Sequence, residues 1–340
     1  MAATLEEDNP GQSHFAVIGA GIAGLACARD LRARGIRVTV FEGGRRIGGR
    51  LASLATDGGD FDAGAQYLTV QNEAFADEVR RWVGADLLRT WDANLADLSN
   101  GQGTLVAPTT SRYVGVPAMQ SVADFVGRDL DIVLEARVTR IARVAGRWSL
   151  HGAGDAPLAA RGFDGLVLAI PSIDALPLVR AETGFAPLLE SVRWDSCWTA
   201  CLALSRPSSI EFDGAFINDD PILAWAARET SKPMRRVGPG VAERWLLQAR
   251  PSWSNNFAEL SAEEAARWMQ RAFAARLARP LAQKSCVALR WGAAVAVDPL
   301  AQACLWDPAL AVGLAGDWCG GARVEAAYLS GTALARAITA

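Results

Sequence analysis

The first fifty residues alternate between apolar and polar stretches in the order strand, loop, helix, strand. Residues 14–18 (HFAVI) are a short apolar run and predict a buried strand. Residues 22–34 carry small side chains on one side and arginines toward the end, which predicts a helix that stops at Gly35. Residues 37–42 (RVTVFE) predict a second strand. This order is typical of the first part of a parallel α/β sheet.

Strands dominate the prediction for the middle of the chain. Residues 131–150 alternate between polar and apolar positions over much of their length. Residues 163–170 (FDGLVLAI) are almost continuously apolar and end at Pro171, which is typical of a strand buried in a parallel sheet. The other elements predicted here are a helix at 72–83, strand and turn at 104–116, and strands at 194–205 and 244–250.

The last third of the chain predicts two helices and a strand. Ser261 and Glu264 match a capping box at the start of a helix over residues 261–279. Residues 311–317 (AVGLAGD) predict a strand, followed by a glycine-rich turn and a helix from about residue 323 to the end. The expected apolar stripe of the first of these helices consists of Ala265, Trp268, Met269 and Phe273.

Nucleotide-binding patterns therefore lie at both ends of the chain, and the segments between them lack such patterns. We expect an α/β fold in which a discontinuous Rossmann-type domain binds a dinucleotide and an interleaved α+β domain binds the substrate. The expected dinucleotide-binding segments are residues 13–70, 104–170 and 285–340. The expected substrate-binding segments are residues 71–103 and 171–284.

Composition excludes several classes of function. A hydrophobic fraction of 51% with 21% charged residues is typical of a soluble globular protein, and a net charge of −3 favours neither nucleic acid nor an anionic membrane as a partner. No apolar run reaches the roughly 18 residues of a membrane helix. The acidic first dozen residues are unlike a signal peptide. Six cysteines without a CxxC pair, and only two histidines, argue against a metal site and predict reduced thiols in the cytoplasm. The oligomeric state stays open.

A GxGxxG loop between the first predicted strand and helix carries the clearest chemistry. Gly19 permits the tight turn, Gly21 lets the backbone approach a pyrophosphate, and Gly24 lets helix and sheet pack closely. The pyrophosphate then faces the free amides at the helix N-terminus, where Ile22 and Ala23 lie. The alternative is a close-packing loop that binds nothing.

A second glycine-rich segment follows the second predicted strand. Glu42 ends that strand about 20 residues after the loop, where a carboxylate can accept hydrogen bonds from a ribose diol. Gly43 and Gly49 let the backbone approach the ligand again, and Arg50 can pair with a phosphate through two hydrogen bonds. Together with the first loop, these residues predict a bound dinucleotide.

Residues 60–67 (DFDAGAQY) carry candidates for contact with a flavin ring. Small side chains at 63–65, Ala65 among them, let the chain run flat beside an isoalloxazine. Gln66 and Tyr67 would then lie near the reactive face of the ring. The alternative is a tight turn with Tyr67 in the core.

The C-terminal strand and helix carry a third set of candidates. Asp317, at the end of the strand, can accept hydrogen bonds from a ribityl chain. The following helix N-terminus offers positive potential to a reduced flavin, which favours hydride acceptance. The alternative is a plain turn between strand and helix. The candidate cofactor-binding residues here are Gly316, Asp317, Arg323, Val324, Glu325 and Ala327.

Few residues elsewhere predict chemistry of their own. The chain has no GxSxG motif, and two histidines leave no Ser-His-Asp arrangement. The reaction would therefore depend on the cofactor. Tryptophans of the central region are expected in the core, with one or two lining a pocket for a flat substrate: Trp194, Trp198, Trp225, Trp245, Trp253 and Trp291.

With these motifs, the sequence resembles the renalases, and in particular their bacterial members, over almost the whole chain. The stretches IGAGIAGLACARDL and GDWCGGARVEAAYLSG also occur in the wider amine oxidase and phytoene desaturase superfamily, so they imply FAD and the fold. The GGRLAS loop is typical of proteins that hold FAD rather than an exchangeable nicotinamide nucleotide. The central matching stretches, with SKP and a W-x-x-x-F pattern, are more specific to the renalases: DFDAGAQYLT, SRYVGVPAMQSV, RVTRI, AWAARETSKPMRR, WLLQARPSWSNNF and LRW.

The resemblance implies a p-hydroxybenzoate hydroxylase-like fold with non-covalent FAD, to which the backbone around Val138 contributes. It implies an oxidase that takes hydride from dihydropyridine isomers of NAD(P)H reduced at ring position 2 or 6. The products are NAD(P)+ and, on reoxidation by O2, H2O2. Gln66, Tyr67, Arg290 and Trp291 are the candidates to flank the substrate. No general base is needed, because rearomatisation of the ring drives hydride departure.

Two other functions remain open. A flavin amine oxidase or desaturase acting on a small hydrophobic metabolite carries the same terminal motifs. Amine oxidases, however, place a lysine near the flavin, and neither Lys232 nor Lys284 lies in a matching motif. A flavin-binding protein without turnover is the third hypothesis. Residues 289–294 (LRWGAA) depart from the renalase pattern, which has a histidine before the Arg-Trp pair and bulkier residues after it, so the expected substrate wall is smaller and less polar.

Overall fold

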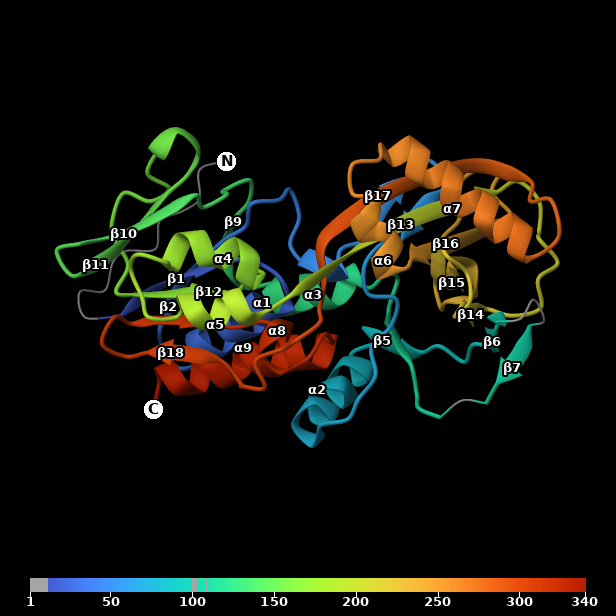
Figure 1. Ribbon diagram of the computed structural model, residues 1–340. Helices are drawn as coiled ribbons and strands as arrows, with labels where there is room; N and C mark the ends of the chain where they lie inside the picture. Colours follow the sequence, from blue (N-terminus) through green and yellow to red (C-terminus); the bar gives the residue numbers. More distant parts are fainter. Residues whose placement is uncertain (1–11, 100–102, 108) are drawn as a thin grey trace.

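Two sheets, one at each end of the molecule, organise the protein (Figure 1). The structure is a computed structural model that describes residues 12–99, 103–107 and 109–340. The first sheet takes its strands from residues 14–41, 131–133, 165–168 and 305–314, and the second from residues 95–106 and 194–296. The chain therefore crosses between the sheets several times.

The first sheet has six strands, five of them parallel, with β18 antiparallel at one edge. Its central strands are almost entirely apolar and buried, as the continuous runs of the sequence predict. In spatial order the strands are β18 (Leu305–Asp307), β19 (Val312–Leu314), β12 (Gly165–Leu168), β1 (His14–Ile18), β2 (Arg37–Phe41) and β9 (Asp131–Val133).

Helices cover both faces of this sheet. One face packs on α1 (Ile22–Ala33), α2 (Glu73–Gly84), α3 (Gln120–Gly127) and α9 (Val324–Ile338). The other face packs on α4 (Ser172–Val179), α5 (Ala186–Ser191) and the hairpin of β10 (Arg140–Val144) and β11 (Arg147–His151).

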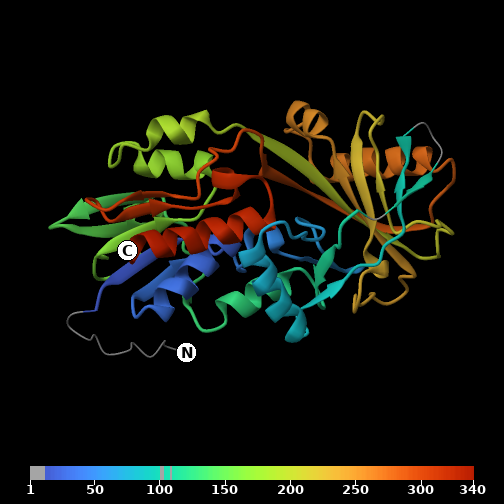
Figure 2. The same cartoon turned by 90° about the horizontal axis from the view of Figure 1, so that it is seen from below.

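Helices α1 and α9 lie side by side although they come from opposite ends of the chain (Figure 2). A Cβ atom on Gly331 would lie 2.0 Å from the carbonyl oxygen of Ala23, so the two backbones are in direct contact. This contact places the start of the C-terminal helix close to the start of the glycine-loop helix.

The second sheet has seven strands, mostly antiparallel, with β14 and β6 paired in parallel. Helices α6 (Pro251–Asn256) and α7 (Ala262–Arg276) pack on one face. The other face packs against residues 61–63. In spatial order the strands are β17 (Gln283–Ala296), β13 (Trp194–Leu204), β16 (Glu243–Ala249), β15 (Leu223–Arg228), β14 (Gly214–Phe216), β6 (Leu95–Asp97) and β7 (Thr104–Val106).

Two short antiparallel strand pairs and one short helix complete the fold. They are β3 (Leu54–Thr56) with β4 (Gly59–Phe61), β5 (Leu88–Thr90) with β8 (Tyr113–Gly115), and α8 (Asp317–Gly320). The expected α/β fold with a Rossmann-like sheet and a second sheet domain is confirmed.

The predicted capping box of α7 is present, but one residue of its apolar stripe is wrong. The Ser261 hydroxyl accepts a hydrogen bond from the Glu264 amide at 3.2 Å, and the Glu264 carboxylate accepts one from the Ser261 amide at 2.9 Å. Met269 and Phe273 are fully buried, whereas Trp268 is 54% exposed. Residues four apart share the buried face, and Trp268 lies one position outside it.

Sheet membership argues for moving three of the expected domain boundaries. Residues 283–296 form β17, which pairs with β13 in the second sheet, although residues 285–296 were expected in the dinucleotide-binding domain. Residues 104–106 likewise join the second sheet through β6. Residues 172–191 form α4 and α5, which pack on the first sheet. The division into domains stays a proposal with these changes.

Among the described residues, no helix combines the length and the apolar character that crossing a membrane requires. The same residues contain no group of three or more histidine, cysteine, aspartate or glutamate side chains arranged to hold a metal ion.

Candidate functional site

The GxGxxG loop adopts the conformation that the glycine spacing predicts. Gly19 has φ +101°, and a Cβ atom there would lie 2.6 Å from the carbonyl oxygen of Ala169. A Cβ atom on Gly24 would lie 2.0 Å from the Gly19 carbonyl oxygen, whereas one on Gly21 would meet nothing within 4 Å. Helix α1 starts directly after Gly21 and no side chain caps its N-terminus. The loop is therefore tightly packed at Gly19 and Gly24. It leaves open space beside Gly21 and free amides at the start of α1.

Glu42 lies against this loop at the end of β2. Its carboxylate accepts a hydrogen bond from the Ala20 amide at 2.9 Å. A Cβ atom on the neighbouring Gly43 would lie 3.3 Å from the Cβ atom of Arg137, and Val138 follows as a partly buried residue. The structure thus brings Glu42, Gly43 and the segment around Val138 together.

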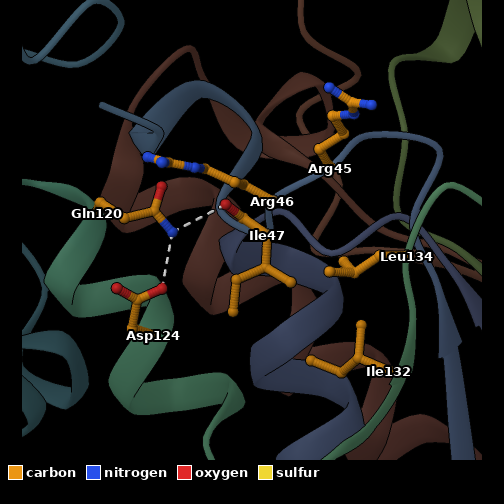
Figure 3. A pocket seen from close by; sticks show the side chains of 7 residues that line it. All are labelled: Arg45, Arg46, Ile47, Gln120, Asp124, Ile132 and Leu134. Carbon is orange, nitrogen blue, oxygen red and sulfur yellow. Dashed lines mark hydrogen bonds between the residues drawn. The ribbon is translucent and has the colours of Figure 1, made fainter. Parts of the chain in front are cut away.

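Residues 47–50 form a second backbone layer beside the glycine loop. The Gly48 amide donates to the Ala20 carbonyl at 2.7 Å, and a Cβ atom on Gly49 would lie 3.4 Å from the Cα atom of Gly21. Gln120 from α3 donates to the Ile47 carbonyl at 2.9 Å (Figure 3). Helix α3 therefore holds the second loop against the first.

A hollow of about 380 Å³ lies beside this second loop (Figure 3). None of the residues that the sequence predicts for FAD or substrate lines it. The hollow therefore does not coincide with the predicted site. Its lining residues are Arg45, Arg46, Ile47, Gln120, Asp124, Ile132 and Leu134.

Arg50 and Asp317 form one unit in the middle of the predicted site. The guanidinium donates to both carboxylate oxygens of Asp317 at 2.7 and 2.6 Å, and to the Ala294 carbonyl of β17 at 3.0 Å. It also lies over the Trp194 ring, 5.3 Å from its centroid. Because Asp317 is only 4% exposed, this pair is a strong, directed contact between the two halves of the site.

The start of α9, at Arg323, has no side-chain cap. The first amides, including that of Val324, are therefore free of side-chain partners. Arg323 itself donates to the Thr69 hydroxyl at 3.0 Å. Just before α8, the Gly316 amide donates to the Ser330 hydroxyl at 3.0 Å.

Two of the predicted C-terminal candidates have other partners. The Glu325 carboxylate accepts hydrogen bonds from the amides of Gln71 and Asn72, both at 2.7 Å. Ala327, a residue of α9, is buried in the core on this face of the first sheet. Both residues position the chain around the site.

Residues 63–65 run along Arg50 and the second sheet. The Ala65 amide donates to the Arg50 carbonyl at 2.9 Å, and a Cβ atom on Gly64 would lie 2.1 Å from the same oxygen. Gln248 of β16 donates to the Gly64 carbonyl at 3.0 Å. The small residues of this segment thus allow its backbone to approach that of Arg50 closely. Their predicted contact with a flavin ring stays a prediction.

Trp291 and Arg290 lie on opposite faces of β17. The Trp291 indole donates to the Ala63 carbonyl at 2.9 Å, so it lies on the face toward the site. Arg290 is exposed and pairs in register with Trp198, which is buried among the residues under α7. Successive side chains of a strand alternate between faces, so the structure does not bring Arg290 to the site.

Gln66 faces a buried cluster of charges. Gln66 is 6% exposed, and its side-chain oxygen accepts a hydrogen bond from Lys232 at 3.2 Å. Lys232 also donates to Asp62 at 3.2 Å and to Glu229, and Arg235 donates to Asp62 at 2.5 Å. We call Asp62, Glu229, Lys232 and Arg235 the buried ion cluster.

Opposing effects set the charge state of Asp62. Burial disfavours its ionised form, but the charges of Lys232 and Arg235, with hydrogen bonds from Arg235 and the Met119 amide, outweigh burial. The pKa of Asp62 is therefore held below its ordinary value, and the cluster has two negative and two positive members.

Tyr67 lies in an aromatic group beside the cluster. Its ring centroid is 6.0 Å from that of Trp225 in an edge arrangement and 6.2 Å from that of Trp91. The guanidinium carbon of Arg112 lies 5.3 Å from the Tyr67 centroid. Both interpretations of Tyr67 are thus compatible with its place: it packs on the core and borders the predicted site.

Sequence reasoning missed Lys232, Gln248 and Arg112. Lys232 was set aside because it lies in no amine oxidase motif, yet it is 2% exposed and contacts Gln66. The signal was available, because all three residues lie in stretches that carry the renalase resemblance. What sequence could not supply was the pairing that brings these stretches together.

The comparisons with known proteins agree with this geometry. Residues 17–82 match the family model described as an NAD(P)-binding Rossmann-like domain. Protoporphyrinogen oxidase 2, chloroplastic/mitochondrial, of Arabidopsis thaliana is 50% identical over 54 residues, which is 16% of this chain. The matched segment spans only 11% of that relative's length.

Solved structures match almost the whole chain. Cyclohexylamine oxidase from Brevibacterium oxydans superimposes with a TM-score of 0.71 and 16% identity, covering 96% of this chain and 99% of that one. A triple mutant of putrescine oxidase gives a TM-score of 0.74 and 15% identity over 96% and 99%. The chain has the fold of the amine oxidases. At these identities the likeness concerns the amine oxidase fold alone.

FAD is the dinucleotide that this amine oxidase fold and these residues fit. The open space before Gly21 and the uncapped N-terminus of α1 suit a pyrophosphate. Glu42 is placed for a ribose, and the segment 63–65 has no bulky side chain that would obstruct a flat ring.

Proposed function

We propose that the protein is an FAD-dependent oxidoreductase, and more narrowly an oxidase of dihydropyridine isomers of NAD(P)H. One observation supports the narrower proposal: four of the separate stretches that carry the renalase resemblance contact residues 62–68. The contacts are Tyr113 with Leu68, Lys232 and Arg235 with Asp62, Gln248 with Gly64, and Trp291 with Ala63.

The residues proposed to hold FAD follow from the geometry above. The amides of α1 would bind the pyrophosphate, Glu42 would bind the adenosine ribose, and the Arg50–Asp317 pair would hold the ribityl chain. The free amides at Val324 would stabilise negative charge on the ring. FAD would supply the two-electron redox chemistry between the substrate and O2.

The side chains around residues 62–67 fit a hydride transfer without a general base. Asp62 and Glu229 are the buried carboxylates there, and both are held by Lys232 and Arg235. Neither of these two carboxylates is therefore an unpaired base. A dihydropyridine needs none, because it loses hydride and becomes aromatic without losing a proton from carbon.

Amine oxidation is the second candidate, and two observations favour it. Solved amine oxidases share the fold, and Lys232 is a buried lysine next to a predicted flavin-facing residue. Against it, the guanidinium carbon of Arg112 lies 5.3 Å from the Tyr67 ring centroid, and this cation repels a protonated amine.

Anaerobic mixing distinguishes the two candidates. The holoenzyme is mixed with ring-position-2 or ring-position-6 dihydro-NAD(P), with ordinary NAD(P)H, with putrescine or with cyclohexylamine, and the visible flavin band is followed. The proposal predicts fast bleaching by at least one isomer and not by the amines. Bleaching by an amine alone would replace the proposal with amine oxidation.

A further inference from the structure

We propose that Arg112, Tyr67 and Trp225 form a substrate-specificity subsite that binds a planar ligand through an anionic group. The subsite rests on the proposed function and adds a substrate feature to it: a phosphate or carboxylate in reach of the reacting ring. Its members come from three separate segments of the chain and meet at the ring of Tyr67.

Backbone pairing places Arg112 at the site. The Leu68 amide donates to the Tyr113 carbonyl at 2.8 Å, and the Tyr113 amide donates back to Leu68 at 2.9 Å. This two-way pairing sets Arg112 beside Tyr67, directly after the segment expected to face the flavin.

Arg112 is unlike the other arginines near the site because its charge is unpaired. Arg50 donates to Asp317 and Arg235 donates to Asp62, but within the described part of the chain no acceptor binds the guanidinium of Arg112. Arg112 is only partly exposed, and its Nε atom is buried. A half-buried guanidinium on an aromatic face is suited to bind an anion with two hydrogen bonds.

Trp225 supplies a second unsatisfied donor in the same group. It is 7% exposed, and its indole nitrogen has no hydrogen-bond acceptor among the residues described. The neighbouring Trp91 differs, because its indole donates to the Ser231 hydroxyl at 3.0 Å. Buried indole donors are normally satisfied, so this one indicates an acceptor supplied from outside the chain.

The chemistry of the group defines the ligand. Tyr67, Trp225 and Phe216, whose centroid is 4.9 Å from that of Trp225, offer aromatic faces to a planar ring. The indole donor suits a carbonyl oxygen on that ring, and the guanidinium suits a phosphate or carboxylate. A dihydronicotinamide nucleotide has all three features.

Matched substrates test the subsite. Flavin bleaching is measured anaerobically against concentration with a dihydronicotinamide mononucleotide isomer, which carries a phosphate, and with the uncharged 1-methyl analogue. Arg112→Gln is expected to weaken the apparent affinity for the phosphate-bearing substrate about 10- to 100-fold, the effect of losing charge-assisted hydrogen bonds. The affinity for the uncharged analogue is expected to stay unchanged.

Two further variants keep the result interpretable. Arg112→Lys retains the positive charge without the planar pair of guanidinium donors. Its affinity for the phosphate-bearing substrate is expected to lie between those of wild type and Arg112→Gln. Arg89→Gln removes an exposed charge from the strand paired with β8 and is expected to leave both substrates unaffected. Equal losses for both substrates in Arg112→Gln, or no loss for either, would overturn the subsite.

A binding measurement separates the subsite from the proposed reaction. Inorganic pyrophosphate and benzoate are titrated into the holoenzyme while the flavin difference spectrum is recorded. The subsite predicts that at least one perturbs the wild type and perturbs Arg112→Gln at least tenfold more weakly, and which one does so identifies phosphate or carboxylate. This result stands even if no dihydropyridine bleaches the flavin, whereas equal or absent responses in both proteins reject the subsite alone.

Discussion

Replacing Lys232 with methionine tests the role of the buried ion cluster. The Lys232 side chain is 0% exposed and its ammonium lies 3.2 Å from both Asp62 and the Gln66 oxygen, with Glu229 in direct contact. Methionine keeps the apolar stem but leaves two carboxylates with Arg235 as their remaining partner in the cluster. We expect the variant to be less stable and to hold FAD more weakly, because the segment 62–66 loses an anchor.

The magnitude follows from burial. Removing one partner from a fully buried ion pair typically costs about 3–5 kcal/mol, because the remaining charge is uncompensated. Replacing an exposed lysine costs far less. Lys284, the other lysine of the sequence, is exposed and donates a hydrogen bond to the Pro239 carbonyl. Lys284→Met is therefore a matched control, expected within about 0.5 kcal/mol of wild type.

The assay is urea unfolding of the holoenzymes, followed by tryptophan fluorescence and by flavin release. The double variant Glu229→Gln with Lys232→Met removes a charge of each sign, so it is expected to be more stable than the sum of its single changes. If Lys232→Met costs no more than Lys284→Met, the cluster does not hold the site together.

The pH dependence of the free energy of unfolding gives a second test of the buried ion cluster. The folded-state pKa of Asp62 is depressed, so its contribution to stability is present above its ordinary value of 3.8 and is lost as pH falls through the depressed pKa. Lys232→Met removes part of that contribution. The gap between wild type and variant is therefore expected to be widest at neutral pH and to narrow below about pH 4.

Three further predictions follow from other contacts. Gly24→Ala places a Cβ atom 2.0 Å from the Gly19 carbonyl, so it should abolish FAD retention, as read from the visible spectrum after purification. Burial chiefly, with the charge of Arg37, lowers the pKa of His14 to about 4, so the free energy of unfolding should fall as pH drops from about 6.5 toward 4. His14→Gln should reduce this pH dependence, as measured by unfolding midpoints over a pH series. Trp291→Phe loses the hydrogen bond to Ala63 and should slow flavin bleaching, whereas Arg290→Gln, on the opposite face of the strand, should not; equal effects would contradict the assigned faces.

The dinucleotide-binding half of the fold was predictable because its signals are local. Gly19, Gly21 and Gly24 each have a steric reason that applies within one strand–loop–helix unit, and the structure shows the same contacts. The capping box at Ser261 and the continuous apolar strand at 165–168 are local in the same way.

The substrate side was less predictable because it depends on long-range pairing. Arg290 and Trp291 are adjacent in sequence, and only the pairing of β17 with β13 decides which of them faces the site. Lys232 lies far in sequence from Gln66, and no periodicity links the two residues. Sheet pairing argues for moving the proposed boundary at residue 285, because one long strand both joins the second sheet and contacts Arg50 through Ala294.

The identity of the bound cofactor tests the central claim most directly. The protein is purified without added nucleotide, its visible spectrum is recorded, and the small molecules released by acid are identified by mass and counted per chain. FAD at about one molecule per chain, lost in Gly24→Ala, is the predicted result. A colourless protein that takes up no FAD on titration, or one that releases a nicotinamide nucleotide instead, would contradict the assignment of these loops to FAD.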